Sequence, residues 1–365
     1  MEFYPPYIGG MGTLFQNLCE GLAKRGHKVT VVTTRLTNAK KQERLNRVNI
    51  IRVNVPSKNE NWQRYWFTFL SIPTVIRLAR QVNIIHTTTF NAAFPAWVAS
   101  KILRKPCVIT VHEIWGELWY EFYGMSKFSS WIYQFFEKMI INLCFDKYIG
   151  VSNSTVRQIN ELGKEAVTIY NGIDYEFFNP KNYNREEIQK LYCFDGKFIY
   201  LFYGRCGLSK GLEYLVEAIP QISKEIPNSL CYLIVSKEPK KIREKIELKI
   251  RSLGNAARMI TPVPYAILPH QIIVSDCVVI PSLSEGFGFS AAEACAMGVP
   301  VVASGCTSLP EVVSGKYILV EPRSSSAIAQ GIIDIHNKEY QISKPKKFTW
   351  DDCVNKHEEL YKQLL

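Results

Sequence analysis

The stretch that decides the fold is Pro281-Ser-Leu-Ser-Glu285-Gly-Phe-Gly-Phe-Ser-Ala-Ala-Glu293-Ala-Cys-Ala-Met-Gly298. An apolar run at 277–281 predicts a buried strand, and the residues from 290 predict a helix. The glycines between them let the backbone approach a ligand closely. The start of the helix presents free N–H groups and the positive end of its dipole, which together favour an anion.

Two carboxylates belong to this stretch. Glu285 lies in the loop before the helix and Glu293 one turn inside it. A carboxylate accepts hydrogen bonds from two hydroxyl groups, so one glutamate suits a sugar and the other a ribose diol. The alternative interpretation is a glycine turn followed by an ordinary helix with a solvated glutamate.

A second stretch, Tyr203-Gly204-Arg205-Cys-Gly-Leu-Ser-Lys210-Gly211, also follows a predicted strand and opens a helix. Arg205 can bind a diphosphate through its bidentate fork and Lys210 as a point charge. Cations destabilise the start of a helix, so a purely structural role explains them less well. Stabilising a departing pyrophosphate is where a sugar transferase needs its catalysis.

Two weaker signals lie in the N-terminal half. Gly9-Gly10-Met-Gly12 precedes the first predicted helix and suits a phosphate, although it lacks the full dinucleotide-binding glycine spacing. His112 ends the predicted strand 107–112, where a side chain reaches a ligand in an α/β domain. A structural histidine is the alternative there. His86 is placed similarly and is weaker evidence.

Short β-type runs alternate with amphipathic helices along the chain, which predicts parallel α/β sheets. Strands are expected at 29–34, 50–55, 84–86, 107–112, 147–151, 167–170, 198–203, 230–235, 277–281, 299–303 and 318–320. The polar segment at about 174–197 is expected to be a domain linker. Thr349, with Asp352 three residues later, predicts an N-cap and a final helix at about 350–364.

The composition fits two globular domains, with 365 residues, 47% of them hydrophobic. The net charge is +11 and concentrates in residues 1–180, which carry +8 against +3 for residues 181–365. An anionic partner or solubility alone would explain this excess. The ten cysteines form no CxxC pair, which favours reduced thiols and a cytoplasmic location. No apolar run reaches the ~20 residues of a membrane span.

Together these motifs resemble glycosyltransferase family 4 along nearly the whole chain. The most specific piece is Glu285-x7-Glu293 within SEGFGFSAAEACAMGVPVVAS, accompanied by YGRCGLSKGLEYLVEA, TIYNGID, VSNST and PPYIGGMG. The resemblance implies a GT-B fold, in which two Rossmann-like, doubly wound parallel-sheet domains face each other across a cleft. The expected N-terminal acceptor domain covers residues 1–178 and the nucleotide-sugar domain 190–345. The final helix, 349–365, is expected to cross back to the N-terminal domain.

The resemblance also implies roles for individual residues. Arg205 and Lys210 would bind the donor diphosphate and act in catalysis with Glu285 and His112. The backbones of Phe287 and Gly288 would help Glu285 to hold the donor sugar and phosphate, and Glu293 would bind the ribose. The remaining implied contacts are Gly10 with the phosphate, His112 with the sugar, and the backbone of Val263 with the base.

The sequence departs from the family pattern in three places. Only residues 1–4 precede the Pro-Pro turn, where the family has a full strand. Ser236-Lys-Glu-Pro239 replaces a Gly-x-Gly-Pro type loop. Thr261 and Pro262 stand where a glycine usually precedes the base-binding valine.

The expected activity is retaining transfer of a hexose-type sugar from a UDP- or GDP-sugar to an acceptor such as a lipid-linked glycan. No carboxylate pair is evident of the kind that glycosidases use, and no DxD motif lies in a candidate loop, so we expect neither a metal nor another cofactor. A sugar-nucleotide epimerase or hydrolase is one alternative, and a non-catalytic sugar-nucleotide-binding subunit is another. No nucleic-acid-binding module accompanies the basic charge, so no nucleic-acid partner is expected.

Two aromatic-rich stretches, 61–70 and 115–123, the second followed by further aromatic residues up to Phe136, lie near basic residues of the N-terminal half. Trp and Tyr favour the membrane–water interface, and Lys and Arg favour anionic lipid. They predict peripheral attachment to the cytoplasmic face of a membrane. Core packing or an acceptor pocket is the alternative for many of these aromatic residues.

Overall fold

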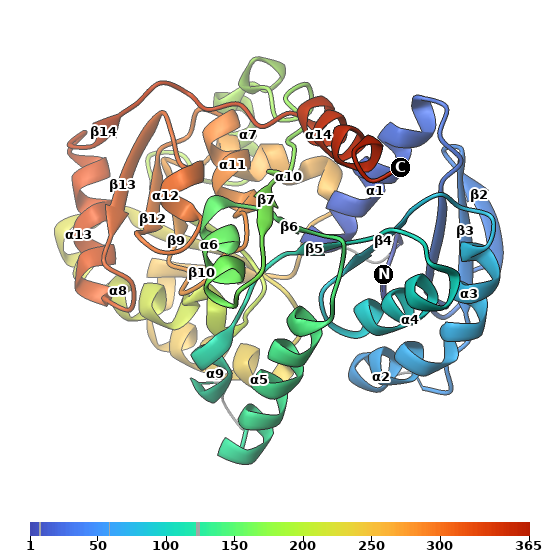
Figure 1. The fold of residues 1–365 in the computed structure, drawn as a ribbon. Helices are drawn as coiled ribbons and strands as arrows, with labels where there is room; N and C mark the ends of the chain where they lie inside the picture. The colour runs from blue at the N-terminus through green and yellow to red at the C-terminus, as the bar shows by residue number, and fades with distance from the viewer. Residues whose placement is uncertain (7–8, 58, 122–124) are drawn as a thin grey trace. The chain divides into compact units, whose positions relative to one another are not determined.

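A computed structural model describes residues 1–6, 9–57, 59–121 and 125–365. The chain forms two compact units (Figure 1). Unit 1 comprises Met1–Gly172 and Phe348–Leu365, and unit 2 comprises Ile173–Lys347. No described helix is long and apolar enough to cross a lipid bilayer.

Unit 1 contains two small sheets. In the first, β1 (Thr30–Thr34) pairs in parallel with β3 (Val48–Val53), which pairs antiparallel with β2 (Gln42–Leu45). The second is fully parallel, in the order β4 (Ile85–Thr88), β5 (Cys107–Val111), β6 (Lys147–Gly150) and β7 (Ala166–Thr168). Every residue of β5 is buried, which explains its unbroken apolar sequence.

The helices of unit 1 surround these sheets. They are α1 (Gly10–Lys24), α2 (Glu60–Leu70), α3 (Ile72–Ala79), α4 (Ala93–Leu103), α5 (Lys127–Asn142), α6 (Asn153–Glu161) and α14 (Trp350–Lys362), with short 3-10 turns η1 (Phe90–Ala92) and η2 (Gly116–Glu121). As predicted, the side chain of Thr349 caps α14 by accepting a hydrogen bond from the Asp352 N–H. Val354 of α14 packs on Leu18 and Leu22 of α1, which confirms that the last helix returns to the N-terminal domain (Figure 1).

The first residues lie alongside β1 without forming a regular strand. The Glu2 carbonyl accepts hydrogen bonds from the Thr34 N–H at 2.9 Å and from the Thr33 hydroxyl at 3.0 Å. The Glu2 carboxylate accepts a third from the Ala92 N–H, at 3.1 Å. This segment therefore ties β1 to the loop after β4.

Unit 2 is built on one sheet in the order β10-β9-β8-β11-β12-β13-β14. Its strands are β8 (Phe198–Gly204), β9 (Ser229–Val235), β10 (Ala257–Ile260), β11 (Cys277–Ile280), β12 (Val301–Ser304), β13 (Lys316–Val320) and β14 (Gln341–Ile342). All neighbours pair in parallel except β14, an antiparallel edge strand. The loops after β8, β9, β10, β11 and β12 therefore emerge at one edge of the sheet.

Helices cover both faces of this sheet. They are α7 (Arg185–Leu191), α8 (Leu212–Glu225), α9 (Lys240–Ser252), α10 (Leu268–Ile273), α11 (Phe289–Ala296), α12 (Leu309–Val312) and α13 (Ser325–His336), with the 3-10 turns η3 (Pro180–Asn182), η4 (Leu208–Lys210), η5 (Gly254–Ala256) and η6 (Tyr265–Ile267). Cys231 and Leu233 join the core under α8, α9 and α13. Tyr232, which alternates with them, donates a hydrogen bond to Gln271 of α10.

The domain boundary in the structure differs from the one predicted from the sequence. The expected linker, about 174–197, belongs to unit 2 and contains η3 and α7, and the N-terminal unit ends at Gly172 rather than at 178. Phe177 explains the difference because its ring stacks on Tyr265 at a centroid distance of 5.0 Å, and Phe178 meets the same ring edge-on. Phe194, at the end of the segment, is fully buried.

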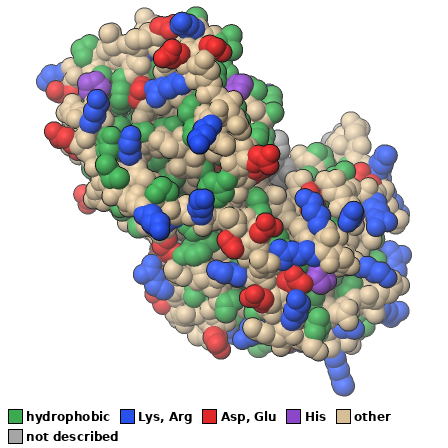
Figure 2. Space-filling model, turned by 90° about the horizontal axis from the view of Figure 1, so that it is seen from above, with side chains coloured by type: hydrophobic (Ala, Val, Ile, Leu, Met, Phe, Trp, Pro, Cys, Tyr) green, Lys and Arg blue, Asp and Glu red, His purple; other side chains and the backbone are tan. Residues whose placement is uncertain are grey.

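The surface charge is mixed. On the face drawn in Figure 2, Lys and Arg side chains are interspersed with Asp and Glu side chains. The net charge of +11 therefore forms no single positive field on this face.

Candidate functional site

The two strongest sequence motifs lie on neighbouring loops of unit 2. The strands that precede them, β8 and β11, pair directly. The Ser209 carbonyl, in the first loop, accepts hydrogen bonds from the Leu283 N–H at 2.7 Å and the Ser284 N–H at 3.3 Å in the second. The two loops therefore form one structural element at the carboxyl edge of the sheet.

Two glycines permit this arrangement. Gly211 has a φ of 59°, and a Cβ there would lie 1.9 Å from the Pro281 carbonyl oxygen. Gly288, the N-cap of α11, has a φ of 88°, and a Cβ would come within 3.0 Å of Leu309. Both positions need a residue without a side chain, because the conformation is left-handed and the space is filled.

Glu285 and Lys210 form an ion pair across the two loops. Lys210 Nζ lies 2.7 Å from Glu285 Oε1, which also accepts a hydrogen bond from the Ser282 hydroxyl at 2.9 Å. The Glu285 backbone is held on both sides: its N–H donates to Thr307 and its carbonyl accepts from Ser308. The nearly buried carboxylate is thus fixed in position beside a cation.

Glu293 lies inside α11 in a drier environment. Burial raises the pKa of Glu293 to about 8, although a hydrogen bond from Tyr203 opposes the shift. The Tyr203 hydroxyl lies 3.0 Å from Glu293 Oε2 and 3.0 Å from the Ser290 carbonyl. The carboxyl group is therefore mostly protonated at neutral pH, and hydroxyl groups that donate to it would favour the carboxylate.

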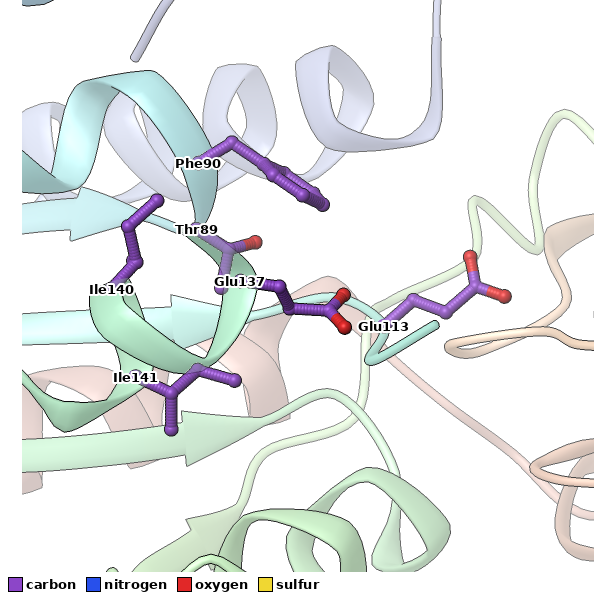
Figure 3. Close-up of a pocket in the computed structure, with 6 residues that line it drawn as sticks. All are labelled: Thr89, Phe90, Glu113, Glu137, Ile140 and Ile141. Carbon is purple, nitrogen blue, oxygen red and sulfur yellow. The ribbon is translucent and has the colours of Figure 1, made fainter. Parts of the chain in front are cut away.

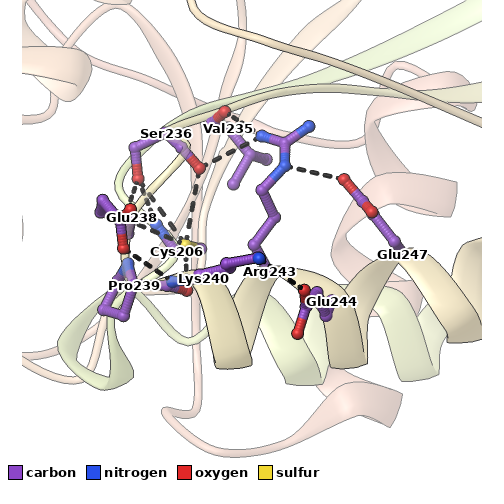
Figure 4. A network of polar contacts seen from close by, with 9 residues as sticks. All are labelled: Cys206, Val235, Ser236, Glu238, Pro239, Lys240, Arg243, Glu244 and Glu247. Atoms are coloured by element: carbon purple, nitrogen blue, oxygen red, sulfur yellow. Dashed lines mark hydrogen bonds and ion pairs between the residues drawn. The ribbon is translucent and has the colours of Figure 1, made fainter.

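Arg205 is exposed, and it makes no ion pair with any residue that the structure describes. Its neighbour Cys206 is buried and fixes the loop, because the Cys206 N–H donates to Ser236 Oγ at 3.2 Å (Figure 4). Arg243 of α9 donates in turn to the carbonyls of Val235 and Ser236. The segment Ser236-Lys-Glu-Pro239, which departs from the family pattern, thus buttresses the backbone beside Arg205.

Val263 and Phe287 are the other unit 2 candidates. Val263 is half-buried in the loop between β10 and η6. Phe287 is buried and meets Phe289 edge-on. Burial raises the pKa of Tyr265, two residues after Val263, and the carboxylate of Glu293 raises it further. The loop after β10 therefore lies near Glu293.

In unit 1, two histidines that look equivalent in the sequence have different surroundings. His86 Nδ1 bonds to Tyr361 of α14 at 2.5 Å and its Nε2 to Thr110 at 2.8 Å. His112 Nε2, by contrast, is shielded from solvent and has no hydrogen-bond partner among the described residues. Burial lowers the pKa of His112 to about 4, so the ring is neutral at physiological pH. The unpartnered nitrogen distinguishes His112 from His86 and leaves His112 able to bond to a ligand, although His357 Nε2 of α14 is buried without a partner in the same way.

Gly10 is the exposed first residue of α1, after the N-cap Gly9. Residues 7 and 8 of the PPYIGGMG motif lie outside the described residues. Phe15, one turn further along α1, lies 6.2 Å from the His112 ring between centroids. Gly10 and His112 thus belong to neighbouring parts of unit 1.

A small hollow in unit 1 has polar as well as apolar side chains in its lining. It is lined by Thr89, Phe90, Glu113, Glu137, Ile140 and Ile141 (Figure 3). The Glu137 carboxylate accepts hydrogen bonds from the N–H groups of Trp115 and Gly116, both at 2.9 Å. Burial nevertheless raises the pKa of Glu137. Glu113 directly follows His112 in the sequence, but His112 is not one of the lining residues of the hollow.

Sequence reasoning found the charged residues of the site but missed the residues that position them. The motif around Tyr203 gives this residue no role of its own, and no motif contains Thr307 or Ser308. Their one signal was position, because Tyr203 lies near the end of β8 and the other two follow β12. Among the described residues, no group of three His, Cys, Asp or Glu side chains is arranged to hold a metal ion.

Comparison with known proteins assigns both halves of the chain. The family described as Glycosyltransferase Family 4 matches residues 8–177, and the family described as Glycosyl transferases group 1 matches residues 184–349. An uncharacterized glycosyltransferase of Methanocaldococcus jannaschii is 27% identical, covering 99% of this chain and 96% of that protein. One of the subunits of human phosphatidylinositol N-acetylglucosaminyltransferase is 22% identical, covering 100% of this chain and 75% of that protein.

A solved structure gives the same fold. The Anabaena protein HepE, in complex with UDP and glucose, superposes with a TM-score of 0.76 at 17% identity, covering 100% of this chain and 98% of that one. This likeness confirms the GT-B fold with two Rossmann-like domains. With family matches across both units, the protein belongs to the glycosyltransferases of the family 4 type and is a transferase enzyme.

Proposed function

We propose that the protein transfers a hexose-type sugar from a UDP- or GDP-sugar to an acceptor, with retention at the anomeric carbon. The observation that carries this proposal is the joining of the loops after β8 and β11 through the Lys210–Glu285 pair, with Arg205 exposed on the first loop. Two cations beside a carboxylate suit a diphosphate attached to a polyol. The similar HepE structure contains UDP and glucose, which supports a donor of this class.

Each residue of the site would have a role that follows from its chemistry. Arg205, Lys210 and the N-terminus of α11 would stabilise the charge that develops on the departing diphosphate. Glu285, held by Lys210 and Ser282, would accept hydrogen bonds from the sugar, and Glu293 from the ribose. Gly10, Val263, Phe287 and Gly288 are proposed backbone contacts, on the family resemblance alone.

Retention is proposed through attack on the face that the leaving group departs from, with the departing phosphate taking the acceptor proton. Glu285 is paired with Lys210, and Glu293 is largely protonated at neutral pH. Neither side chain is therefore suited to be the free carboxylate nucleophile of a double displacement. His112, neutral and with an unpartnered buried nitrogen, would hydrogen-bond to the sugar.

We also propose that the reaction needs no metal, because Arg205 and Lys210 supply the positive charge that a divalent cation would bring to a diphosphate. The proposed location is the cytoplasm, since all ten cysteines are free thiols. A lipid-linked glycan is the proposed acceptor, supported by the phosphatidylinositol in the name of the similar human glycosyltransferase subunit. No nucleic acid is proposed as a partner.

Thermal stabilisation by UDP-, GDP- and ADP-sugars tests the donor. A ligand at 100 times its Kd stabilises the folded state by about 2.7 kcal/mol, which raises the Tm of a unit of this size by roughly 5–10 °C. If none of these donors raises the Tm, the donor proposal is refuted.

Product analysis tests the reaction itself. Incubation with the stabilising donor and glycan acceptors should give a product with the donor's anomeric configuration. Free or epimerised sugar without acceptor would establish the hydrolase or epimerase alternative instead. Donor binding without any turnover would establish a sugar-nucleotide-binding subunit.

A further inference from the structure

Helix α5 is inverted relative to an ordinary surface helix. Its buried face carries Ser130, Gln134, Glu137 and Ile141. Its exposed face carries large rings: Phe128 is 69% exposed, Trp131 and Phe135 are each 52% exposed, and Phe136 is 45% exposed. An amphipathic helix normally places its apolar residues against the core, so this orientation needs an explanation.

The polar inner face has a structural purpose. Gln134 Nε2 donates to Glu117 of η2 at 3.0 Å, and Glu137 accepts from the backbone at the start of η2. Ser130 donates to the Ser126 carbonyl at the start of α5. The Gln134 and Glu137 contacts with η2 and the residue before it fix the rotation of α5 and therefore direct its aromatic face outward.

Helix α2 repeats the pattern beside α5. Gln63 and Phe67 are buried, whereas the rings of Trp62, Trp66 and Phe69 are 44–62% exposed. The hydroxyl groups of Tyr65 and Tyr133 lie 3.1 Å apart and join the two helices. The two helices thus meet at this tyrosine pair, and their exposed rings are together called the aromatic surface below.

The aromatic surface exposes a large total apolar area. It contains eight rings that are 40–69% exposed. With about 150–250 Å² for each aromatic side chain, they expose roughly 600–1,000 Å². The largest contiguous apolar patch of a typical soluble monomer is about 300–600 Å² and is often functional, so the two helices together expose more apolar area than one such patch.

The charges near the aromatic surface indicate which kind of partner binds there. The exposed charged side chains of α5, Lys127 and Lys138, are both cationic, because Glu137 faces inward. Arg64 lies half-buried on α2, and the exposed acids Glu117 and Glu121 belong to η2. A second copy docked face to face would bring like charges together, whereas an anionic lipid surface would neutralise them.

We propose that the aromatic surface docks unit 1 on an anionic lipid membrane, with α2 and α5 lying along the headgroup region. Trp and Tyr favour that region because one part of the ring system is apolar and another forms hydrogen bonds. Such binding is peripheral, since the rings enter only the headgroup boundary.

The surface also relates to the proposed acceptor, and this step rests on the proposed function. The face of α5 opposite the rings contributes Glu137 and Ile141 to the hollow beside Glu113 (Figure 3). One helix therefore carries the proposed lipid contact on one side and lines the hollow that contains Glu113 on the other. A lipid-linked acceptor held at the membrane would present its glycan near that hollow.

Vesicle co-sedimentation tests the docking surface directly. The full chain is mixed with phosphatidylcholine vesicles, with and without phosphatidylglycerol, at low and high salt. We expect binding to the anionic vesicles that weakens with salt. Trp131→Ser combined with Phe135→Ser should weaken it at least about tenfold, and Lys127→Glu combined with Lys138→Glu at least about 25-fold.

Matched controls come from unit 2. Leu191 and Leu248 are 73% and 67% exposed, so the change of both to Ser removes comparable exposed apolar area outside the aromatic surface. Lys224 is an exposed lysine of α8 and provides the charge control as Lys224→Glu. These controls should bind vesicles as the unchanged protein does.

Two results would overturn the proposal. One is the absence of binding to anionic vesicles at low salt. The other is concentration-dependent dimerisation that the Trp131 and Phe135 changes abolish, which would assign the surface to a second copy. Donor-induced thermal stabilisation, measured on the same variants, should be unchanged, so a failure of docking is distinguishable from a failure of the proposed function.

Discussion

Removing the Lys210 ammonium group should reduce turnover strongly while costing little stability. In the structure Lys210 Nζ lies 2.7 Å from Glu285, with the two side chains 28% and 9% exposed. Exposed pairs contribute about 0.2–1 kcal/mol, and breaking a buried pair costs about 3–5 kcal/mol. Glu285 keeps its hydrogen bond from Ser282, so we expect Lys210→Ala to destabilise unit 2 by about 1–2 kcal/mol. The corresponding fall in Tm is about 2–8 °C.

The expected loss of activity is much larger than that loss of stability. If Lys210 stabilises the departing diphosphate, its removal should lower kcat by roughly 10²–10³-fold, by analogy with the loss of one oxyanion donor. Steady-state kinetics with the donor identified by thermal shift measure this. Arg205→Ala should lower kcat similarly with no fall in Tm, because Arg205 is exposed and makes no ion pair with the described residues.

Lys249→Ala is the matched control. Lys249 Nζ lies 2.8 Å from Glu217, and the lysine side chain is 39% exposed, but this pair joins α9 to α8 away from the loops of the site. Its loss should leave kcat unchanged. Near-normal turnover in both Lys210→Ala and Arg205→Ala would refute the assignment of the diphosphate to these loops.

Four further outcomes are expected. Glu293→Ala should raise KM more than Glu285→Ala does, and Glu285→Ala should lower kcat more, because the ribose does not react; the reverse would refute this division of roles. Activity should survive EDTA, and a loss that Mg²⁺ or Mn²⁺ restores would contradict metal independence. His112→Ala should lower kcat with little change in Tm, whereas His86→Ala should lower Tm by removing its bond to Tyr361; equal effects on Tm would remove the distinction. Because the pKa of Glu293 is raised to about 8 in the folded state, its contribution to stability is fully present below about pH 4.5 and is lost as the pH rises toward 8. Urea unfolding of Glu293→Gln should therefore show a flatter pH dependence than the unchanged protein between these values.

The sequence predicted the fold well wherever strands are buried on both faces. β8, β9 and β11 read as unbroken apolar runs because helices cover both sides of the sheet. It missed β2, whose four residues are largely exposed and carry no apolar pattern. The turn that joins β2 to β3 has positive φ at both Asn46 and Arg47. An Asn-Gly pair at these two positions would have predicted the hairpin, but an arginine in the second position does not predict one.

The site was predictable where local sequence dictates local geometry. Glycines, cations and carboxylates at the ends of strands are visible as motifs because each acts within one loop. Tertiary partners were not visible. His86 and His112 look alike in the sequence, since the residue that satisfies His86, Tyr361, lies 275 positions away on α14. The inverted orientation of α5 likewise depends on contacts with η2 rather than on its own pattern.

The Lys210–Glu285 pair leaves each partner with unused hydrogen-bonding capacity for a charged donor. A lysine ammonium has three N–H donors, and Glu285 Oε1 takes one of them. The pair therefore fixes the direction of the lysine side chain while leaving hydrogen atoms for a phosphate. Glu285 Oε1 in turn accepts from both Lys210 and Ser282, so its second oxygen is the one suited to a sugar hydroxyl. Because Gly211 permits the approach of the two loops, a side chain at that position would separate the cation from the carboxylate and disturb both functions together.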